Sequence, residues 1–151
     1  MTEWPRIAVG AVVLKNNDEI LLIKRKYPPS SNLWSIPGGH VEVGEPILVA
    51  LFRELEEETS LKASKATLLA ITEYIRLRKN YSVKYHYIIL DYLITDAEGE
   101  PIANEESLDI GFFRFSEALK LELTDTTKEL IRLIMSEGTN KVKHIVNVVY
   151  E

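Results

Sequence analysis

The chain has 151 residues, of which 46% are hydrophobic and 27% charged, and its formal net charge at pH 7 is −5. This length and composition are typical of one globular domain, spanning residues 1–151, that buries a core of its own. The negative charge argues against a partner that is a nucleic acid polymer, because such proteins grip phosphates with excess positive charge. The absence of cysteine excludes disulfides, thiolate catalysis and cysteine-ligated metal sites.

The N-terminal residues give no targeting signal. Residues 1–6 lack the basic and apolar regions of a signal peptide. No apolar run approaches the roughly 20 residues that are needed to span a bilayer. We therefore expect a cytoplasmic protein that has no membrane partner.

The first half of the chain predicts strands followed by one helix. The strands are expected, in chain order, over residues 7–14, 19–24 and 34–36. Prolines predict a loop over residues 27–32, and Pro37-Gly38-Gly39 is expected to end the third strand. The helix begins at Pro46, where a missing N–H costs least, and continues to Thr59.

The second half predicts four more strands and a second helix. The strands are expected over residues 66–77, 83–93, 109–115 and 145–150. The helix is expected over residues 124–137, with Asp125 or Thr126 as its N-cap and Gly138 as its end. The order of strands, helix, strands and helix predicts an α+β fold, in which helices pack on a mixed β-sheet.

The first predicted helix and the loop before it carry an unusual density of carboxylates. Six glutamates lie between Glu42 and Glu58, together with a single base, Arg53. Like charges three or four residues apart on a helix repel one another. A divalent cation is the simplest partner that would offset this repulsion.

Helical spacing divides these side chains by role. The apolar residues that follow the i, i+3, i+4, i+7 pattern, and that we expect to pack on the sheet, are Leu48, Leu51, Phe52 and Leu55. Glu54, Glu57 and Glu58 are expected to converge on an adjacent stripe, while Glu56 points away. Hard carboxylate oxygens suit Mg²⁺, which Mn²⁺ can replace, and the backbone at Gly39 can add a carbonyl ligand.

The segment from Gly39 to Leu61 has a fixed pattern of polar residues. It consists of Gly39, then Glu45 after five residues, then the run Arg53-Glu54-Leu55-Glu56-Glu57-Glu58-Thr59-Ser60-Leu61 after seven more. This pattern resembles the signature of the Nudix hydrolase family. Ser60 is the one departure, because the family usually has glycine there to relax a left-handed helix end. Residues 9–13, 28–39 and 85–87 are similar to the ADP-ribose pyrophosphatase branch of the family.

The resemblance implies the Nudix fold, an α/β/α sandwich, and hydrolysis that depends on a divalent metal. It implies that Glu54, Glu57 and Glu58 hold Mg²⁺, together with Gly39. The metal would neutralise the diphosphate oxygens and activate a water. We therefore count Glu54 and Glu57 among the catalytic residues.

The resemblance also implies a structural brace and a general base. Arg53 would pair with Glu45 and fix the loop against the helix, and Gly38 would support the same site. The base that takes the proton of the attacking water is either Glu57 or Glu106, which lies in the loop ahead of the strand predicted over residues 109–115.

Four residues are candidates for contact with the substrate. Trp34 would stack on a base or, as we favour for a tryptophan beside an apolar strand, pack in the core. Tyr85 and Tyr87 alternate along a strand and carry the same two interpretations. Arg76 belongs to a small basic patch, which is either a solvated turn or a site for a terminal phosphate.

The resemblance favours hydrolysis of ADP-ribose to AMP and ribose 5-phosphate. One alternative is a pyrophosphohydrolase of nucleoside triphosphates, including oxidised purine nucleotides. Another is a catalytically silent domain that senses a nucleotide. All three imply a small-molecule nucleotide partner. The C-terminal residues 141–151 are a further segment that can pair with a second subunit in a homodimer.

Overall fold

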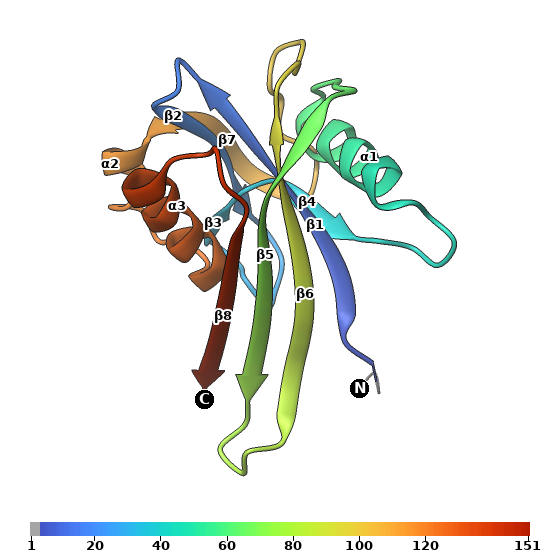
Figure 1. Cartoon of the computed structure of the whole chain (residues 1–151), viewed down its shortest axis with the longest axis vertical. Coiled ribbons are helices and arrows are strands. Elements are labelled where there is room, and N and C mark those ends of the chain that lie inside the picture. The colour runs from blue at the N-terminus through green and yellow to red at the C-terminus, as the bar shows by residue number, and fades with distance from the viewer. Residues whose placement is uncertain (1–3) are drawn as a thin grey trace.

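The computed structural model describes residues 4–151, and its strands and helices follow the predicted order (Figure 1). The strands are β1 (Arg6–Lys15), β2 (Glu19–Arg25), β3 (Trp34–Ser35), β4 (Gly38–His40), β5 (Ala66–Leu77), β6 (Val83–Ile94), β7 (Ser107–Arg114) and β8 (Lys143–Tyr150). The helices are α1 (Ile47–Thr59), α2 (Phe115–Ala118) and α3 (Asp125–Glu137). Strand β4 and the short helix α2 were not predicted. Within residues 4–151, no helix is long and apolar enough to cross a membrane.

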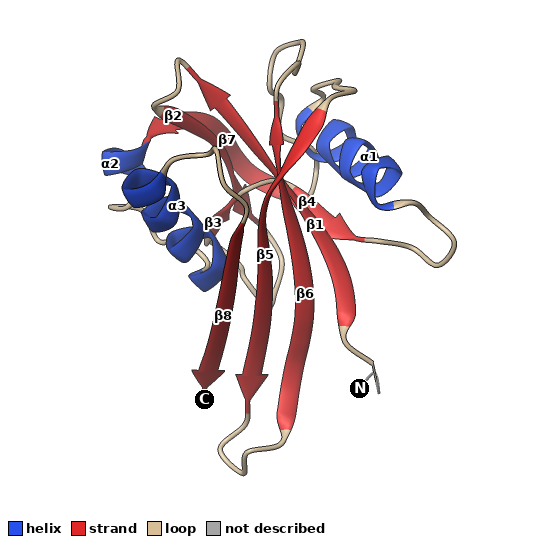
Figure 2. Ribbon diagram, in the orientation of Figure 1, coloured by secondary structure: helices blue, strands red, loops and turns tan. Residues whose placement is uncertain are grey.

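The strands form one mixed sheet, as the sequence predicts (Figure 2). Their order is β3-β2-β1-β6-β5-β8, with β4 beside β1 and β7 beside β2. Strand β1 runs parallel to β6, and β5 runs parallel to β8. The remaining neighbours are antiparallel.

Helices α1 and α3 cover opposite faces of this sheet (Figures 1 and 2). Alternate residues of β1 show which face is which, because successive side chains of a strand point to opposite sides. Val9 and Ala11 pack with α1, whereas Val12 packs with α3. We call these two sides the α1 face and the α3 face. The arrangement confirms the predicted α/β/α sandwich.

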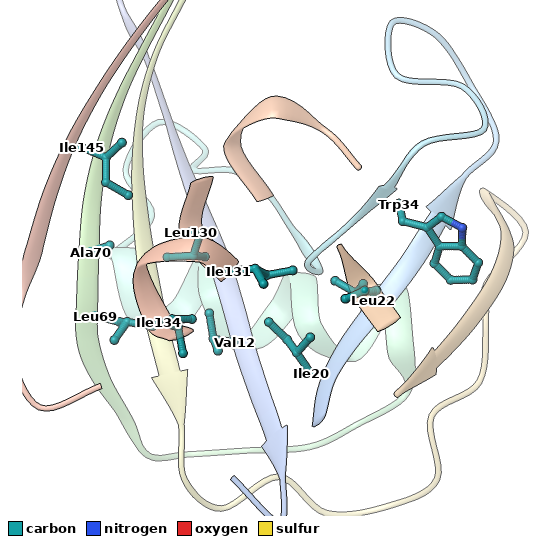
Figure 3. Close-up of a cluster of buried hydrophobic side chains, with 11 residues drawn as sticks. Val12, Ile20, Leu22, Trp34, Leu69, Ala70, Leu130, Ile131, Ile134 and Ile145 are labelled. Carbon is teal, nitrogen blue, oxygen red and sulfur yellow. The ribbon is translucent and has the colours of Figure 1, made fainter. Parts of the chain in front are cut away.

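The cluster on the α3 face joins the sheet to α3 and to strand β3 (Figure 3). Its buried members include Val12, Ile131 and Trp34. Trp34 is 8% exposed, and its ring meets that of Phe113 edge-on with 4.9 Å between centroids. The core interpretation of Trp34 is therefore confirmed, and the indole has no open face on which a base can stack.

Helix α1 has the predicted bounds but not the predicted orientation. Pro46 is its N-cap, and the helix ends at Thr59. The residues that it buries are Ala50, Leu51, Leu55 and Thr59. Leu48 is 43% exposed, so its predicted place on the sheet is wrong. The helix is rotated toward Glu54 and Glu58 because these side chains lie against the glycines of β4, where there is no side chain to exclude them.

Two local predictions need correction. Pro37-Gly38-Gly39 was expected to end the extended segment, but Gly38–His40 form strand β4 and pair with β1. The N-cap of α3 is Thr124 rather than Asp125 or Thr126. Thr124 has an extended backbone with ψ of 151°, and its hydroxyl oxygen accepts a bond from the N–H of Thr127 at 3.4 Å. A threonine there serves as a cap because its oxygen reaches an N–H that the helix leaves unpaired.

Ser60, the departure from the family pattern, ends α1 in the left-handed conformation, with φ of 68°. Its N–H donates to the carbonyl of Glu56 at 2.9 Å. Because a side chain raises the energy of this conformation, we expect Ser60→Gly to increase the free energy of unfolding by about 1 kcal/mol. Thermal and urea unfolding followed by circular dichroism measure the change. Ser60→Ala keeps the strain and is the matched control; an equal gain in both variants would contradict this explanation.

Candidate active site

The centre of the site is the contact between the glycines of β4 and two glutamates of α1. The N–H of Gly38 donates to Oε1 of Glu58 at 2.7 Å. The carboxylate of Glu54 lies directly on Gly39, where the Cβ of any other residue would collide with it. A Cβ at Gly38 would collide with the carbonyl of Val9 on the neighbouring strand. Gly39 therefore lets the helix approach β4 closely enough for its carboxylates to meet the backbone, and Gly38 lets β4 lie close against β1.

Arg53 connects the loop before α1 to the carboxylates on the helix. Its Nε and Nη2 donate to the two oxygens of Glu45 at 2.7 and 2.9 Å, which confirms the predicted pair. Its Nη1 donates to Glu54 at 2.9 Å and to Glu57 at 3.3 Å. Its Nη2 also reaches the carbonyl of His40 at 3.3 Å. A planar guanidinium suits this role because its five N–H groups diverge in fixed directions.

Burial and hydrogen bonding separate the glutamates into two groups. The bidentate bond from Arg53 lowers the pKa of Glu45 to about 2. Burial raises the pKa of Glu54, against the lowering effect of Arg53. Burial also raises the pKa of Glu58, to about 7, and the Gly38 N–H and the charge of Arg25 offset only part of that effect. The negative charge at Glu58 is therefore the least compensated of the three, and a nearby cation would stabilise it.

The three predicted metal ligands are not gathered at one point. Within residues 4–151, no three carboxylate or imidazole groups stand together in an arrangement that holds a metal ion. Glu57 turns outward to Arg53 with 57% of its side chain exposed, while Glu54 and Glu58 turn inward to the glycines. Glu54 and Glu57 meet at Nη1 of Arg53, whereas Glu58 binds the Gly38 N–H, so the metal set of all three glutamates stays a prediction. The donor set still fits a hard divalent cation, because it offers carboxylate oxygens and glycine carbonyls beside an undercompensated charge.

Glu106 lies on the same cavity as Glu58, as the catalytic interpretation of Glu106 requires. The cavity has a volume of about 250 Å³ and is lined by Ile23, Arg25, Lys26, Tyr27, Pro28, Glu58, Glu106 and Ser107. The Glu106 N–H donates to the side chain of Asn104 at 3.0 Å, and the Asn104 amide donates to the carbonyl of Glu57 at 3.2 Å. Asn104 therefore ties the loop of Glu106 to the end of α1.

Sequence reasoning missed the two cations of this cavity, Arg25 and Lys26. Arg25 is the last residue of β2, and the register between β2 and β7 shifts at Lys24 and Arg25. Such a bulge re-aims a side chain, and here the charge of Arg25 acts on both Glu58 and His40. The N–H of Lys26 donates to the carbonyl of Glu106 at 3.1 Å. The bulge lies between segments that are more than 80 residues apart in the chain, so no local sequence pattern predicts it.

Three of the predicted substrate residues lie on the α3 face and are linked to β4 by His40. The rings of His40 and Tyr87 stack in parallel with 5.6 Å between centroids. The ring centroids of Tyr87 and Tyr85 are 6.1 Å apart. Arg76 of β5 lies opposite Tyr85 of β6 in the strand register. These side chains form a row that begins next to Gly39. His40 directly follows the glycine pair in the sequence, but its ring contact was not predicted.

Asp91 is a buried carboxyl on the α3 face. It was not predicted as a site residue. It is 4% exposed, and its Oδ1 occupies the space above Gly10, where a Cβ would collide with it. Within residues 4–151, neither Asp91 Oδ1 nor the nearby Thr72 hydroxyl has a hydrogen-bond partner. Burial raises the pKa of Asp91 to about 7.

Comparison with known proteins identifies the family. The sequence matches the NUDIX domain over residues 4–134, which is most of its length. The chain belongs to the Nudix family. Members of this family generally use divalent metal ions. The family match thus includes the signature residues 39–61, in agreement with the resemblance in their spacing.

Relatives within the Nudix family differ in substrate. An ADP-ribose pyrophosphatase of Methanocaldococcus jannaschii is 32% identical over 117 residues, which cover 78% of this chain and 66% of that protein. A human 8-oxo-dGDP phosphatase is 42% identical over 65 residues, which cover 43% of this chain and 20% of that protein. A MutT NUDIX hydrolase structure from Burkholderia pseudomallei superposes with a TM-score of 0.76 at 33% identity, covering 86% of this chain and 98% of that one. The chain thus spans no more than two thirds of these curated relatives.

We expect Asp91 to make the Nudix chain less stable as the pH rises. Its pKa is about 7 in the folded state against 3.8 ordinarily, so the folded chain keeps a proton that the unfolded chain releases between these values. The free energy of unfolding therefore falls across this window, by on the order of 4 kcal/mol at most from this group. Asp91→Asn should remove that fall, so that the variant gains stability over the unchanged protein at pH 8 but not at pH 4.

Urea unfolding at several pH values tests this expectation. Asp96→Asn is the control of opposite sign, because hydrogen bonds from Ser64 lower the pKa of Asp96, and its stabilisation is lost as the pH falls. A pH profile of Asp91→Asn parallel to that of the unchanged protein would contradict the buried, uncompensated carboxyl.

Proposed function

We propose that this chain hydrolyses the diphosphate linkage of ADP-ribose to AMP and ribose 5-phosphate, with Mg²⁺ as its metal and Mn²⁺ as a substitute. The observation that carries the proposal is the cavity in which Glu58 and Glu106 face Arg25 and Lys26. Hydrolysis of a diphosphate needs acidic groups for a metal and cations for the phosphate oxygens, and this cavity offers both. The 32% identical ADP-ribose pyrophosphatase supports this choice of substrate.

The groups that would hold the metal are Glu54, Glu57, Glu58 and the carbonyl of Gly39. When bound, a divalent ion neutralises the phosphate oxygens and makes a water more acidic. The chain itself positions these ligands, since the glycine pair admits Glu54 and Glu58 and Arg53 fixes the helix to the loop at Glu45. Glu57 has more than half of its side chain exposed, so a rotation away from Arg53 brings it into the set.

Glu106 is our first choice for the general base, with Glu57 as the alternative. Glu106 faces the cavity beside Glu58, and two hydrogen bonds through Asn104 fix its loop to the helix that carries the metal ligands. Glu57 is engaged by Arg53 at 3.3 Å. A base must lie within reach of the attacking water, and the position of Glu106 on the cavity wall is the more suitable one.

Arg25 and Lys26 are placed to bind the oxygens of the diphosphate. Both line the cavity, and the bulge at the end of β2 directs Arg25 toward Glu58. Without substrate, this cation partly offsets the buried charge of Glu58. A substrate phosphate would compete for the same guanidinium, which presents several N–H donors to an oxyanion.

The row of aromatic side chains on the α3 face is suited to the nucleoside. It starts at His40, next to Gly39, and continues through Tyr87 and Tyr85 to Arg76. A base can stack on such rings, and Arg76 would take a phosphate or a ribose hydroxyl at the far end. Trp34 has no part in this row because the core encloses it.

A second candidate function is the pyrophosphohydrolysis of nucleoside triphosphates, including oxidised purine nucleotides. The relative named RNA pyrophosphohydrolase favours the release of pyrophosphate, and the relative named 8-oxo-dGDP phosphatase favours an oxidised purine nucleotide as substrate. A catalytically silent sensing domain is less consistent with the sequence, which keeps each polar residue of the Nudix signature.

The products separate these functions. We expect purified protein with Mg²⁺ to release AMP from millimolar ADP-ribose and to form no pyrophosphate, with chromatography of the nucleotides as the measurement. A parallel reaction with dGTP and its 8-oxo derivative tests the second candidate, for which pyrophosphate is the product. Absence of AMP together with pyrophosphate release would replace the first proposal by the second, and binding without turnover of any substrate would leave the sensing domain.

Substitutions in α1 test the metal site. We expect Glu58→Gln to lower kcat by roughly 10²-fold or more and to raise the Mg²⁺ concentration needed for half activity, because it removes a charged ligand. Glu106→Gln should lower kcat by a similar factor at an unchanged Mg²⁺ requirement, because it removes a base. Glu56→Gln is the matched control, since Glu56 points outward to Lys62 at 3.8 Å and should keep normal activity. Near-normal kcat in Glu58→Gln would refute this assignment.

A further inference from the structure

The segment that leads to β7 runs antiparallel along the end of α1 and the residues that follow this helix. Lys62 and Glu98 exchange two backbone hydrogen bonds, with N–O distances of 3.0 and 2.8 Å. Further along the segment, the N–H of Ile102 donates to the carbonyl of Thr59 at 2.8 Å. The last carbonyls of a helix have no partner within the helix, so donors from another segment can satisfy them. Residues 98–104 thus dock on the end of the helix that carries the proposed metal ligands.

The side chain of Asn104 continues this contact and extends it to Glu106. Its Nδ2 donates to the carbonyl of Glu57 at 3.2 Å. Its Oδ1 accepts from the N–H of Glu106 at 3.0 Å and from the hydroxyl of Ser107 at 3.2 Å. Asparagine suits both tasks, because its amide has donors on one atom and an acceptor on the other. One side chain therefore connects the helix to the residue that is our first choice for the base.

Glu106 needs a restraint because its charge acts on that of Glu58. Burial is the main cause of the raised pKa of Glu58, and the charge of Glu106 raises this pKa further. The two carboxylates therefore repel each other in the cavity that both of them line. The backbone of Glu106 is held from two sides against this force. Asn104 accepts its N–H, and the N–H of Lys26 donates to its carbonyl at 3.1 Å.

We propose that Asn104 is a positioning residue, which holds the carboxylate of Glu106 at a fixed place relative to Glu58. Asn104 acts through Glu106, so this inference rests on the proposed function, in which Glu106 is the base. A base must lie within hydrogen-bond reach of its water, and a misplacement of about 1 Å can lower a rate by roughly 10²-fold. The bond to Glu57 is exposed to solvent, where a hydrogen bond adds little to stability. Its loss should therefore lower kcat without a large change in the melting temperature.

Two substitutions of Asn104 separate its contact with the helix from its contact with the loop. Asn104→Ala removes both contacts. We expect kcat for ADP-ribose to fall by about tenfold or more, at a nearly unchanged KM and Mg²⁺ requirement. Asn104→Asp keeps the acceptor for Glu106 and Ser107 but replaces the donor to Glu57 by an oxygen, so kcat should also fall. A normal kcat in Asn104→Ala, or in Asn104→Asp alone, would overturn the proposal.

Asn80 provides the matched control, because it makes a similar local contact elsewhere. Its Oδ1 accepts from the N–H and the hydroxyl of Ser82 at 3.0 and 2.6 Å. It lies in the turn between β5 and β6, at the end of the sheet that is far from α1 (Figure 1). Asn80→Ala should keep a normal kcat. A loss equal to that in Asn104→Ala would show a general effect of such turns on the fold and would overturn the positioning role.

A double-mutant cycle shows whether Asn104 acts through Glu106. In the Glu106→Gln background, Asn104→Ala should lower kcat by less than about twofold, because the base that it positions is already absent. Losses that multiply would show that Asn104 acts independently of Glu106 and would overturn the proposal. A normal kcat in Glu106→Gln would instead overturn the base assignment of the proposed function, and this inference with it.

Amide hydrogen exchange tests the docking of the loop without any substrate, so it decides the matter even if ADP-ribose is not hydrolysed. Asn104→Ala should accelerate exchange over residues 102–107 several-fold, because the N–H of Glu106 loses its acceptor and the loop loses its link to α1. Exchange in the buried strand β1 should stay unchanged. Equal exchange rates of residues 102–107 in the variant and the unchanged chain would overturn this inference alone.

Discussion

The contact of two glycines with two carboxylates is the constraint on which the rest of the site depends. Glu58 accepts the N–H of Gly38, and Glu54 lies on Gly39 where a Cβ would collide with it. A side chain at Gly39 would push α1 away from β4, and one at Gly38 would collide with the Val9 carbonyl of β1. The rotation of the helix, the exposure of Leu48 and the outward direction of Glu57 all follow from this approach. The glycines of β4 thus decide which glutamates of α1 lie in the site.

That approach divides the charge of the helix unevenly. Arg53 binds Glu45, Glu54 and Glu57, so one cation serves three carboxylates. On the inner side, Glu58 has only a backbone N–H and the more distant charge of Arg25, and burial raises its pKa to about 7. A protein gains no stability from such a group, since burying an incompletely paired charge is costly. The incompletely compensated negative charge of Glu58 is consistent with a site that binds a cation.

The sequence predicted those features that depend on neighbours in the chain. Strand β5 has the predicted bounds, and α1 extends from Pro46 to Thr59 because proline favours its start and Ser60 takes the left-handed end. The orientation of α1 was missed, because the apolar pattern of a helix cannot show that the opposing strand lacks side chains. The N-cap at Thr124 was missed by one residue, a difference that local composition does not resolve when Thr124, Asp125 and Thr126 are all capable caps.

The parts of the site that were not predicted come from long-range contacts. Arg25 acts on Glu58 across a bulge, and Asn104, which is 47 residues from Glu57 in the sequence, joins that residue to Glu106. Asp91 lies buried over Gly10, and this proximity exists only because β1 and β6 run parallel. Each of these contacts requires the sheet order, which no motif in the sequence encodes. The signature residues, in contrast, lie within one helix and the loop before it.

The same geometry explains why the signature identifies a reaction more readily than a substrate. The acidic residues of α1 lie on one face of the sheet, whereas Tyr85, Tyr87 and Asp91 lie on the other. The two sets meet at β4, where Gly39 touches Glu54 and His40 stacks on Tyr87. In the proposed function, a substrate spans this strand with its diphosphate on one side and its nucleoside on the other. Residues that read the nucleoside can therefore change without disturbing the carboxylates, so relatives that share the signature are free to differ in substrate.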